Sequence, residues 1–208
     1  MRILVLCDDH WHPAAVPRAG LQPLAGEFEF EWIENAADWS AERMAAFPVV
    51  ILTKSNGTSA ADDTPWMTPA AEKAFAGYVA AGGGLLAVHS GTAGYTETPV
   101  LRGLLGGVFD HHPEQCLVEF APVAGEPLAA GLAPFTVKDE HYFMAMDDLE
   151  APVFLTSASE HGAQSAGWTR RVGKGRVCVL TPGHNLPVWL HPTFQQALRA
   201  SIHWCAQN

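Results

Sequence analysis

Histidine side chains recur where apolar segments of this sequence stop abruptly. His12, His89 and His184 each follow such a segment within a few residues, although the chain has only ten histidines in all. Neutral imidazole is a common metal ligand and transfers protons near neutral pH. These three residues are therefore the first candidates for a site that binds a metal ion or moves protons.

Two further segments are dense in groups that bind metals, hydrogen-bond sugars or transfer protons. Residues 109–115 include His112, and residues 138–142 include Glu140 and Tyr142. We expect both segments to close over the edge that carries the histidines. Glu140 would then act as a general base or a metal ligand, and Tyr142 as an acid or a hydrogen-bond donor to substrate.

Loop residues beside these groups are candidates for contacts with a substrate. Aromatic rings offer flat faces on which a sugar can stack, and amide, hydroxyl and imidazole groups can hydrogen-bond to it. The candidates of this kind are Trp11, His12, Asn56, Ser90 and Trp189, and Trp66 lies in a similar predicted loop. Ordinary packing is the alternative for each tryptophan. Ser90 follows a sharp turn, as a G-x-S-x-G nucleophile does, but the first glycine of that pattern is missing.

The elements that must position these residues alternate as strand and helix, which predicts parallel βαβ units. Strands are predicted over residues 2–7, 28–34, 47–52 and 85–88, and helices over residues 13–25 and 69–81. Thr68 suits the N-cap of the second helix and Glu72 suits its dipole, while the glycines at 82–84 end it. The strand at 28–34 alternates aromatic and acidic residues, which is typical of a position near a sheet edge.

The second half of the chain predicts fewer long helices. Strands are expected over 116–123 and 152–157, a β-hairpin over 167–172 and 176–180, and a final helix with an apolar stripe from Phe194 to Cys205. These elements predict one domain, residues 1–208, with a flavodoxin-like three-layer α/β/α sandwich and a mostly parallel sheet with an antiparallel hairpin. Open α/β sheets bind ligands beyond the carboxyl ends of their parallel strands, where the histidines are expected.

The composition excludes several classes of partner. The chain has 208 residues, of which 48% are hydrophobic, and a formal net charge of −10 with four lysines, so we expect neither nucleic acid nor membrane to be bound. Its apolar stretches are far shorter than the roughly 20 residues of a membrane-spanning helix. The first residues read as a strand rather than a signal peptide, so we expect a cytoplasmic protein.

Five motifs after residue 69 occur in the order of a known family. They are GGGLLAVHS at 82–90, LLGGVF at 104–109 followed by His112-Pro113, DEHY at 139–142, GKGRV at 173–177 followed by Gly183-His184, and IHW at 202–204. In this combination the sequence resembles the ThuA-like (trehalose utilisation) family of the class I glutamine amidotransferase-like superfamily. The resemblance implies the fold of that superfamily and a role in carbohydrate metabolism.

The same resemblance argues against amidotransferase activity. In that superfamily the sharp turn after the central strand presents a cysteine nucleophile, whereas here His89 occupies the turn and Ser90 follows it. The thiolate that attacks an amide is therefore missing from this position. The four cysteines, Cys7, Cys116, Cys178 and Cys205, form no C-x-x-C pair and are expected to be reduced and largely buried.

The family motifs carry His89, His112, Glu140 and His184. This set, as the resemblance implies it, would suit a divalent metal such as zinc or manganese, and no nucleotide cofactor is expected. Two alternatives stay open at this point. One is a metal-free acid/base or sugar-binding cleft, and the other is a group of histidines that only hydrogen-bond their own loops.

The function expected from these observations is that of an enzyme acting on a small sugar or keto-glycoside. Lyase, isomerase and hydrolase chemistry are all compatible, with His89 and His184 as metal ligands or proton carriers. One alternative is a non-catalytic sugar- or metal-binding regulatory module on the same fold. Another is a redox or stress protein, which would need a reactive cysteine at the turn. Exposed aromatic residues at the rim would allow a homodimer.

Overall fold

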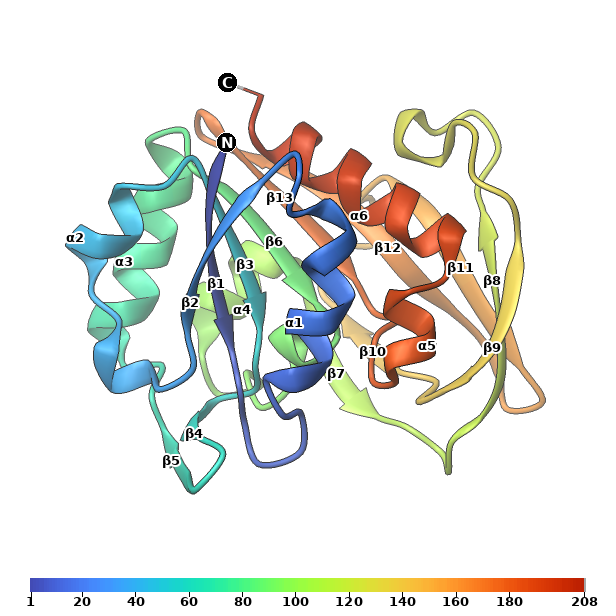
Figure 1. Cartoon of the computed structure of the whole chain (residues 1–208), viewed down its shortest axis with the longest axis horizontal. Coiled ribbons are helices and arrows are strands. Elements are labelled where there is room, and N and C mark those ends of the chain that lie inside the picture. Colours follow the sequence, from blue (N-terminus) through green and yellow to red (C-terminus); the bar gives the residue numbers. More distant parts are fainter. Residues whose placement is uncertain (208) are drawn as a thin grey trace.

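A nine-stranded sheet runs through residues 1–207, the part of the chain that this computed structural model describes (Figure 1). Across the sheet the order is β2 (Glu29–Ile33), β1 (Arg2–Cys7), β3 (Val49–Thr53), β6 (Gly84–Val88), β13 (Gly175–Leu180), β12 (Gly162–Val172), β11 (Val153–Ser159), β8 (Cys116–Pro122) and β9 (Phe135–Asp139). Strands β2 to β13 in this order are parallel, and each later pair is antiparallel. The predicted α/β fold is confirmed, and its antiparallel part extends from the predicted hairpin β12–β13 to β11, β8 and β9.

The central parallel strands are apolar along their length because both of their faces are covered. Every residue of β3 and β6 is buried, as their continuous apolar runs predict. Strand β2 lies at one edge of the sheet, as its alternating sequence predicts, and its acidic residue Glu29 is exposed there.

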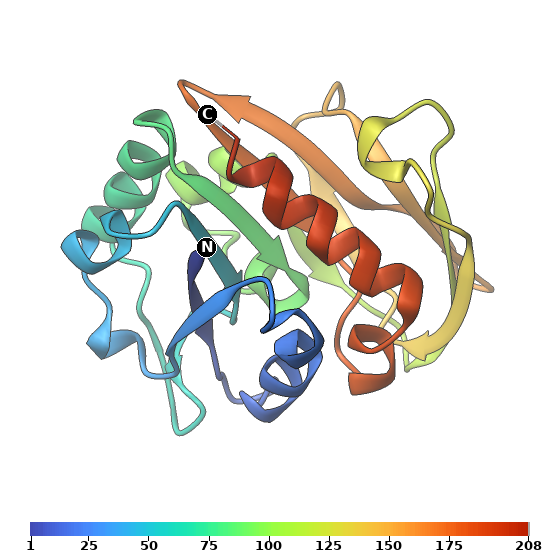
Figure 2. The ribbon, with the colours of Figure 1, turned by 45° about the horizontal axis from the view of Figure 1, so that its top comes forward.

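Helices cover both faces of the sheet and complete the predicted three-layer sandwich (Figures 1 and 2). One core includes residues of α1 (Ala15–Leu21), α5 (Leu186–Trp189) and α6 (Pro192–Cys205), and the other includes residues of α2 (Ala41–Ala45), α3 (Pro69–Ala80) and α4 (Pro99–Leu105). Successive residues of β1 alternate between them, since Ile3 and Val5 pack in the first core and Leu4 and Leu6 in the second. Short 3-10 turns lie at η1 (Gln22–Leu24), η2 (Ala36–Asp38), η3 (His89–Thr92) and η4 (Pro127–Ala129).

Helix α6 lies across one face of the sheet with the buried stripe that its sequence predicts (Figure 2). It has 14 residues. Throughout residues 1–207, the helices are all too short or too polar to span a lipid bilayer.

Two small two-stranded antiparallel sheets, of which the first is a hairpin, extend the end of the molecule toward which the parallel strands run. They are β4 (Gly57–Ser59) with β5 (Asp62–Pro65), and β7 (Gly107–His111) with β10 (Phe143–Met146). In Figure 1 the hairpin β4–β5 projects at the lower end, and the N-terminus lies at the opposite end. The strands of the first pair are very short, and both pairs have an irregular register. Neither pair therefore gives a clear alternating pattern in the sequence.

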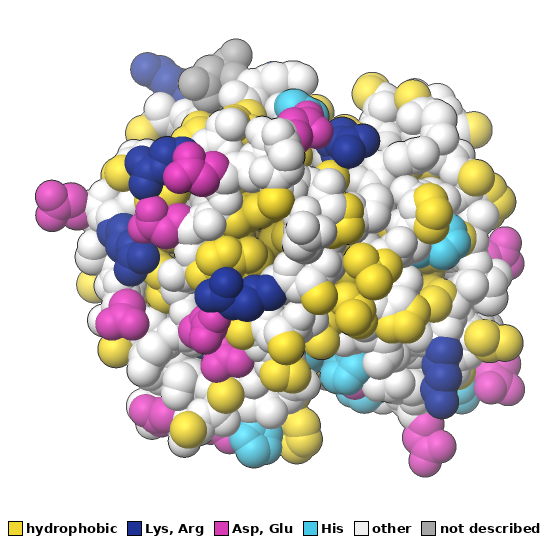
Figure 3. Space-filling view, in the orientation of Figure 1, with side chains coloured by type: hydrophobic (Ala, Val, Ile, Leu, Met, Phe, Trp, Pro, Cys, Tyr) yellow, Lys and Arg dark blue, Asp and Glu magenta, His cyan; other side chains and the backbone are white. Residues whose placement is uncertain are grey.

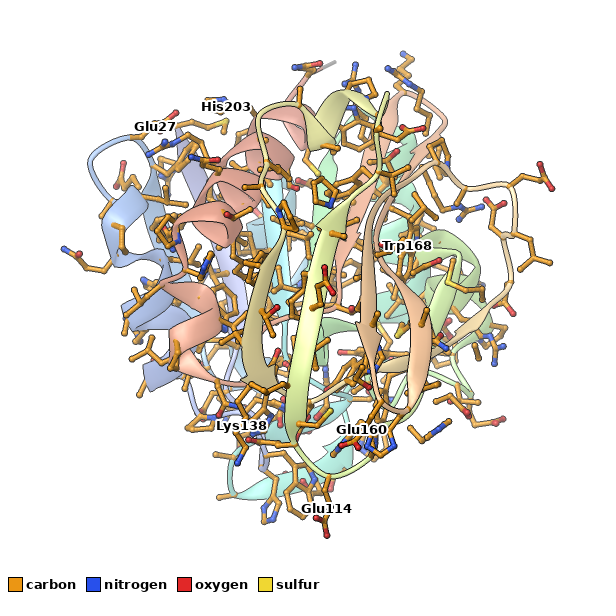
Figure 4. All side chains as sticks on the ribbon, turned by 90° about the vertical axis from the view of Figure 1, so that its right-hand side faces the viewer. Glu27, Glu114, Lys138, Glu160, Trp168 and His203 are labelled. Carbon is orange, nitrogen blue, oxygen red and sulfur yellow. The ribbon has the colours of Figure 1, made fainter. Side chains whose placement is uncertain are left out.

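Figure 4 shows the antiparallel part of the sheet from the side, with the same end of the molecule at the bottom. Glu114 and Lys138 lie at the lower end of this view, near the carboxyl end of β9, whereas Glu27 and His203 lie at the upper end. His203 contacts the Glu27 carboxylate there. This histidine therefore belongs to a surface pair far from the strand ends.

The N-terminus of α3 follows its sequence signals, with Glu72 in the first turn as predicted, but Glu72 also has a role that its position in the sequence does not indicate. The Thr68 hydroxyl accepts a hydrogen bond from the amide of Ala71, as expected of an N-cap. Glu72, however, is buried and accepts hydrogen bonds from the amides of Val100 at 2.7 Å and Leu101 at 2.9 Å. Its carboxylate therefore caps the neighbouring helix α4, because α3 and α4 pack side by side.

Glu72→Ala should lower the free energy of unfolding by roughly 2 kcal/mol, because it leaves two amides at the start of α4 without their charged acceptor. Urea denaturation followed by circular dichroism measures the change. Lys73→Ala, one residue away and exposed, serves as the matched control and should leave the midpoint almost unchanged. Equal effects of the two substitutions would contradict this capping role.

The cysteines provide a second prediction. Cys7, Cys178 and Cys205 are buried and Cys116 is partly exposed. Burial raises the pKa of the Cys7 thiol to about 12 and that of Cys205 well above its usual range. Iodoacetamide at pH 8 should therefore label Cys116 alone in the native protein and all four cysteines after denaturation, as mass spectrometry can count. Rapid labelling that persists in Cys116→Ser would instead support the redox alternative.

Candidate functional site

The loops that follow the parallel strands enclose a pocket of about 660 Å³. It is lined by residues that lie far apart in the sequence: Trp11, His12, Ser55, Asn56, Gly57, Asp63, Pro65, Ala93, Gly94, Phe109, His112, Glu140, Tyr142 and His184. Figure 3 shows histidine side chains at the surface along the lower edge of the molecule, the end toward which these strands run. The pocket lies at the carboxyl ends of the parallel strands, the part of the sheet where a ligand site is expected.

Three imidazoles and one carboxylate meet at this end. One nitrogen or oxygen atom from each of His12, His89, Glu140 and His184 lies within 4.8 Å of the others. The Glu140 Oε2 atom is 3.4 Å from His89 Nε2 and 3.1 Å from His184 Nδ1. We call these four residues the His/Glu cluster.

His12 is held by the buried carboxylate of Asp9. Asp9 Oδ1 accepts hydrogen bonds from His12 Nδ1 at 2.8 Å and from the amides of Trp11 and His12, while Oδ2 accepts one from the amide of Ser55 at 2.7 Å. Burial acts to raise the pKa of Asp9, but the hydrogen bonds from His12 and the backbone lower it below its usual value. Asp9 is therefore ionised, which keeps the proton of His12 on Nδ1 and turns Nε2 toward the cluster.

His89 occupies the sharp turn after β6, in the left-handed region with φ of 47°. Gly91 makes the turn fit, because a Cβ atom there would lie 1.9 Å from the carbonyl oxygen of Leu52. His89 Nδ1 donates a hydrogen bond to the carbonyl of Thr181 at 2.8 Å, and its ring stacks on Tyr142 with centroids 4.0 Å apart. Burial lowers the pKa of His89 to about 4, so its imidazole is neutral near pH 7.

A second buried carboxylate, Asp139, fixes the loop that carries His184. It accepts hydrogen bonds from the amides of Gly183 at 2.9 Å, His184 at 3.1 Å and Asn185 at 3.1 Å. Burial raises the pKa of Asp139 to about 6, against the opposing effect of these amides. Sequence reasoning named neither Asp139 nor Asp9 as functional. For Asp9 the available signal was an acidic residue shortly after an apolar strand and three residues before His12, and for Asp139 it was an acidic residue next to the candidate Glu140.

Glu140 is ionised at the centre of the cluster. Burial acts to raise the pKa of this carboxyl, but the neighbouring His184 and His89 side chains hold it well below its usual range. The carboxylate in turn raises the pKa of His184. Tyr142, also buried, has its pKa raised by burial and by Glu140, so its hydroxyl stays protonated.

His12 and His112 differ from the ligand set that the family motifs imply. His12, predicted to contact substrate, joins the cluster, whereas His112 lies outside it on the pocket wall. His112 Nε2 is 3.6 Å from Glu140 Oε1, its Nδ1 donates to the carbonyl of Pro113, and 34% of its side chain is exposed. The reason is the turn at Asp9, whose carboxylate bonds the backbone and the ring of His12 and brings this residue inward.

Three predicted rim residues lie elsewhere in the structure. Trp189 is 1% exposed and donates a hydrogen bond to the carbonyl of Gly183, because the short helix α5 turns it into the core. Trp66 is buried against Phe75 and other aromatic rings, and Ser90 is buried in the turn after β6. None of the three is among the described residues that line the pocket, so the structure does not support their predicted contacts with a substrate.

Trp11, Asn56 and Tyr142 line the pocket, consistent with their predicted role in substrate contacts. The Trp11 side chain is free to meet a ligand, since Trp11 is 70% exposed. Asn56 also has a structural contact, because its Oδ1 accepts a hydrogen bond from the amide of Met67.

His141 provides an internal comparison for the cluster. It is buried, and both of its ring nitrogens have a partner, Ser159 Oγ at 2.7 Å and Ser157 Oγ at 3.0 Å. Its role is packing and hydrogen bonding. In the cluster, by contrast, His12 and His89 each have one bonded nitrogen and one that faces the shared centre.

Comparisons with known proteins agree with this fold. A thua-like protein from Parabacteroides merdae has a TM-score of 0.80 at 16% identity, covering 100% of this chain and 90% of that chain. A thua-like protein from Bacteroides uniformis gives 0.77 at 18%, covering 99% and 91%. A cytoplasmic protein from Salmonella typhimurium LT2 gives 0.70 at 17%, covering 99% and 97%. No curated protein matches the chain in sequence.

The profile of the ThuA family, described as trehalose utilisation, matches residues 2–205. The match spans nearly the whole chain and includes every residue of the His/Glu cluster. The chain therefore belongs to the ThuA family.

Proposed function

We propose that this protein is an enzyme of carbohydrate metabolism that transforms a small sugar or a keto-glycoside in the pocket. The observation that carries the proposal is an ionised carboxylate, Glu140, at the pocket with imidazoles of His184, His89 and His112 at 3.1, 3.4 and 3.6 Å. Groups so placed can remove a proton from a substrate carbon or deliver one to a departing oxygen. Lyases, isomerases and hydrolases of sugars all require such transfers.

The pocket residues suggest separate roles in this chemistry. Tyr142 keeps its proton and can donate a hydrogen bond or a proton to a substrate oxygen. His184, whose pKa is raised by Glu140, is the imidazole best suited to carry a proton near neutral pH. His89, deeply buried and neutral, instead contributes a nitrogen lone pair to the centre.

The walls of the pocket favour a neutral ligand. The described residues that line it include no lysine or arginine but two acidic side chains, Asp63 and Glu140. These would repel a phosphate group, whereas an uncharged sugar could stack on Trp11 and hydrogen-bond to Asn56.

A non-catalytic sugar-binding or regulatory module is the second candidate. It is favoured by the occupant of the sharp turn, where a histidine stands in the place of the superfamily's cysteine nucleophile. The same residue gives no support to glutamine hydrolysis. Saturable sugar binding without turnover, measured on one protein sample, would favour this module over the enzyme.

Glu140→Gln should lower kcat/KM on the best substrate of a sugar and keto-glycoside panel by about 100-fold or more, because it removes the negative charge from the centre of the site. Glu119→Gln, an exposed residue of β8, is the control and should retain full activity. Product formation by chromatography provides the measurement. Unchanged turnover in Glu140→Gln would rule out the proposed site.

Trp11→Ala should raise KM by roughly 5- to 10-fold, the equivalent of a stacking contact of about 1 kcal/mol, while kcat stays nearly constant. Trp11→Phe keeps an aromatic face and should recover most of the affinity. The exposure of Trp11 means that neither change should lower the melting temperature. An unaltered KM in Trp11→Ala would exclude it from the sugar-binding surface.

A further inference from the structure

The His/Glu cluster contains ring nitrogens whose hydrogen-bonding capacity is unused. Within residues 1–207, His12 Nε2, His89 Nε2 and His184 Nδ1 are buried and have no hydrogen-bond partner. Glu140 Oε2 lies 3.4 Å from His89 Nε2 and 3.1 Å from His184 Nδ1, but neither contact is a hydrogen bond. An unsatisfied buried polar atom is unfavourable, and three of them within one small volume call for a common partner.

We propose that His12 Nε2, His89 Nε2, His184 Nδ1 and a carboxylate oxygen of Glu140 together bind one divalent transition-metal ion. One ligand atom from each of the four residues lies within 4.8 Å of the others. Ligand atoms about 2.0–2.1 Å from a tetrahedral zinc are separated by roughly 3.3 Å, so a modest contraction of the cluster would bring them into the coordination sphere.

Contacts outside the cluster hold two of these ligands in the tautomer that a metal requires. The Asp9 carboxylate and the Thr181 carbonyl accept the Nδ1 protons of His12 and His89, so that Nε2 of each ring carries a lone pair. Carboxylate and carbonyl partners of this kind commonly orient metal-binding histidines. His141, which uses both nitrogens in hydrogen bonds to serines, shows that a purely structural histidine in this protein is satisfied by protein atoms.

The charge and the donor types narrow the class of ion. The buried carboxylate of Asp9, which is hydrogen-bonded to His12, and the carboxylate of Glu140 add negative charge at the cluster, which favours a cation. Three imidazole nitrogens with one carboxylate suit zinc, cobalt, manganese or iron rather than magnesium or calcium, which prefer oxygen ligands.

The ion would face the pocket, because His12, Glu140 and His184 are lining residues. Bound there, a divalent metal would polarise a carbonyl or hydroxyl oxygen of the ligand. The inference rests on the proposed function only in that the ion would serve the same site. The evidence for the ion itself is the geometry of the four side chains.

Metal binding is tested on the full chain after removal of bound metal with a chelator and dialysis. Titration calorimetry with Zn²⁺ and absorption spectroscopy with Co²⁺ should show one ion per chain and the visible bands of Co²⁺ with nitrogen ligands. His12→Ala, His184→Ala and Glu140→Gln should each weaken binding by about 100-fold or more. Mg²⁺ at millimolar concentration should not compete.

His112→Ala is the sharpest control, because His112 contacts Glu140 from outside the cluster. It should keep the affinity within about 3-fold of the unaltered protein, as should His161→Ala on the surface. His12→Ala is a second safeguard against misfolding, since circular dichroism and melting without metal should match the unaltered protein. Zn²⁺ at 100 times its Kd should then raise Tm by about 5 °C in the unaltered protein but not in this variant.

Two results would overturn the inference. One is the failure of Zn²⁺ and Co²⁺ to bind saturably, and the other is a loss of affinity in His112→Ala as large as that in His12→Ala. Metal binding without turnover of any sugar would count against the proposed function while supporting the metal site. Turnover of a sugar by protein that binds neither Zn²⁺ nor Co²⁺ would support the proposed function and contradict the metal site.

Discussion

Two buried carboxylates hold the candidate site together. Asp9 accepts the amides of Trp11, His12 and Ser55, so it joins the loop after β1 to the loop after β3. Asp139, at the end of β9, accepts three consecutive amides of the loop after β13. Hydrogen bonds to a charged group contribute more than neutral ones, and a buried amide that lost its partner would be strongly unfavourable. Loops that would otherwise be mobile are therefore fixed where they present His12 and His184.

The sharp turn after β6 supplies the third imidazole in a different way. The backbone of His89 adopts a left-handed conformation, and Gly91 lets the turn pass close to β3. This backbone presents the imidazole stacked on Tyr142 and aimed at Glu140. The tight turn and the packing around it therefore fix the direction of the His89 side chain.

The sequence allowed the layers, the parallel strands and the end of the sheet that carries the site to be predicted, because these follow from apolar periodicity and from the rule for open α/β sheets. Side-chain direction within loops could not be predicted. His12 turns inward because of hydrogen bonds to Asp9, and Trp189 turns into the core because four residues form the short helix α5. The family motifs pointed to His112 rather than His12, because a motif does not indicate which way a loop side chain is turned. A motif identifies a segment, but the contacts of the folded chain decide which of its side chains reach the centre.

The hairpin β4–β5 contributes to the pocket without belonging to the nine-stranded sheet. It pairs with itself as a two-stranded sheet, and every residue of β5 is exposed. It nevertheless contributes Asp63 and Pro65 to the pocket wall. Insertions, deletions or exchanges in this hairpin could therefore change the size and charge of acceptable ligands during evolution without disturbing the nine-stranded sheet. Related proteins could diverge in what they bind through this short segment while keeping one shared reactive centre.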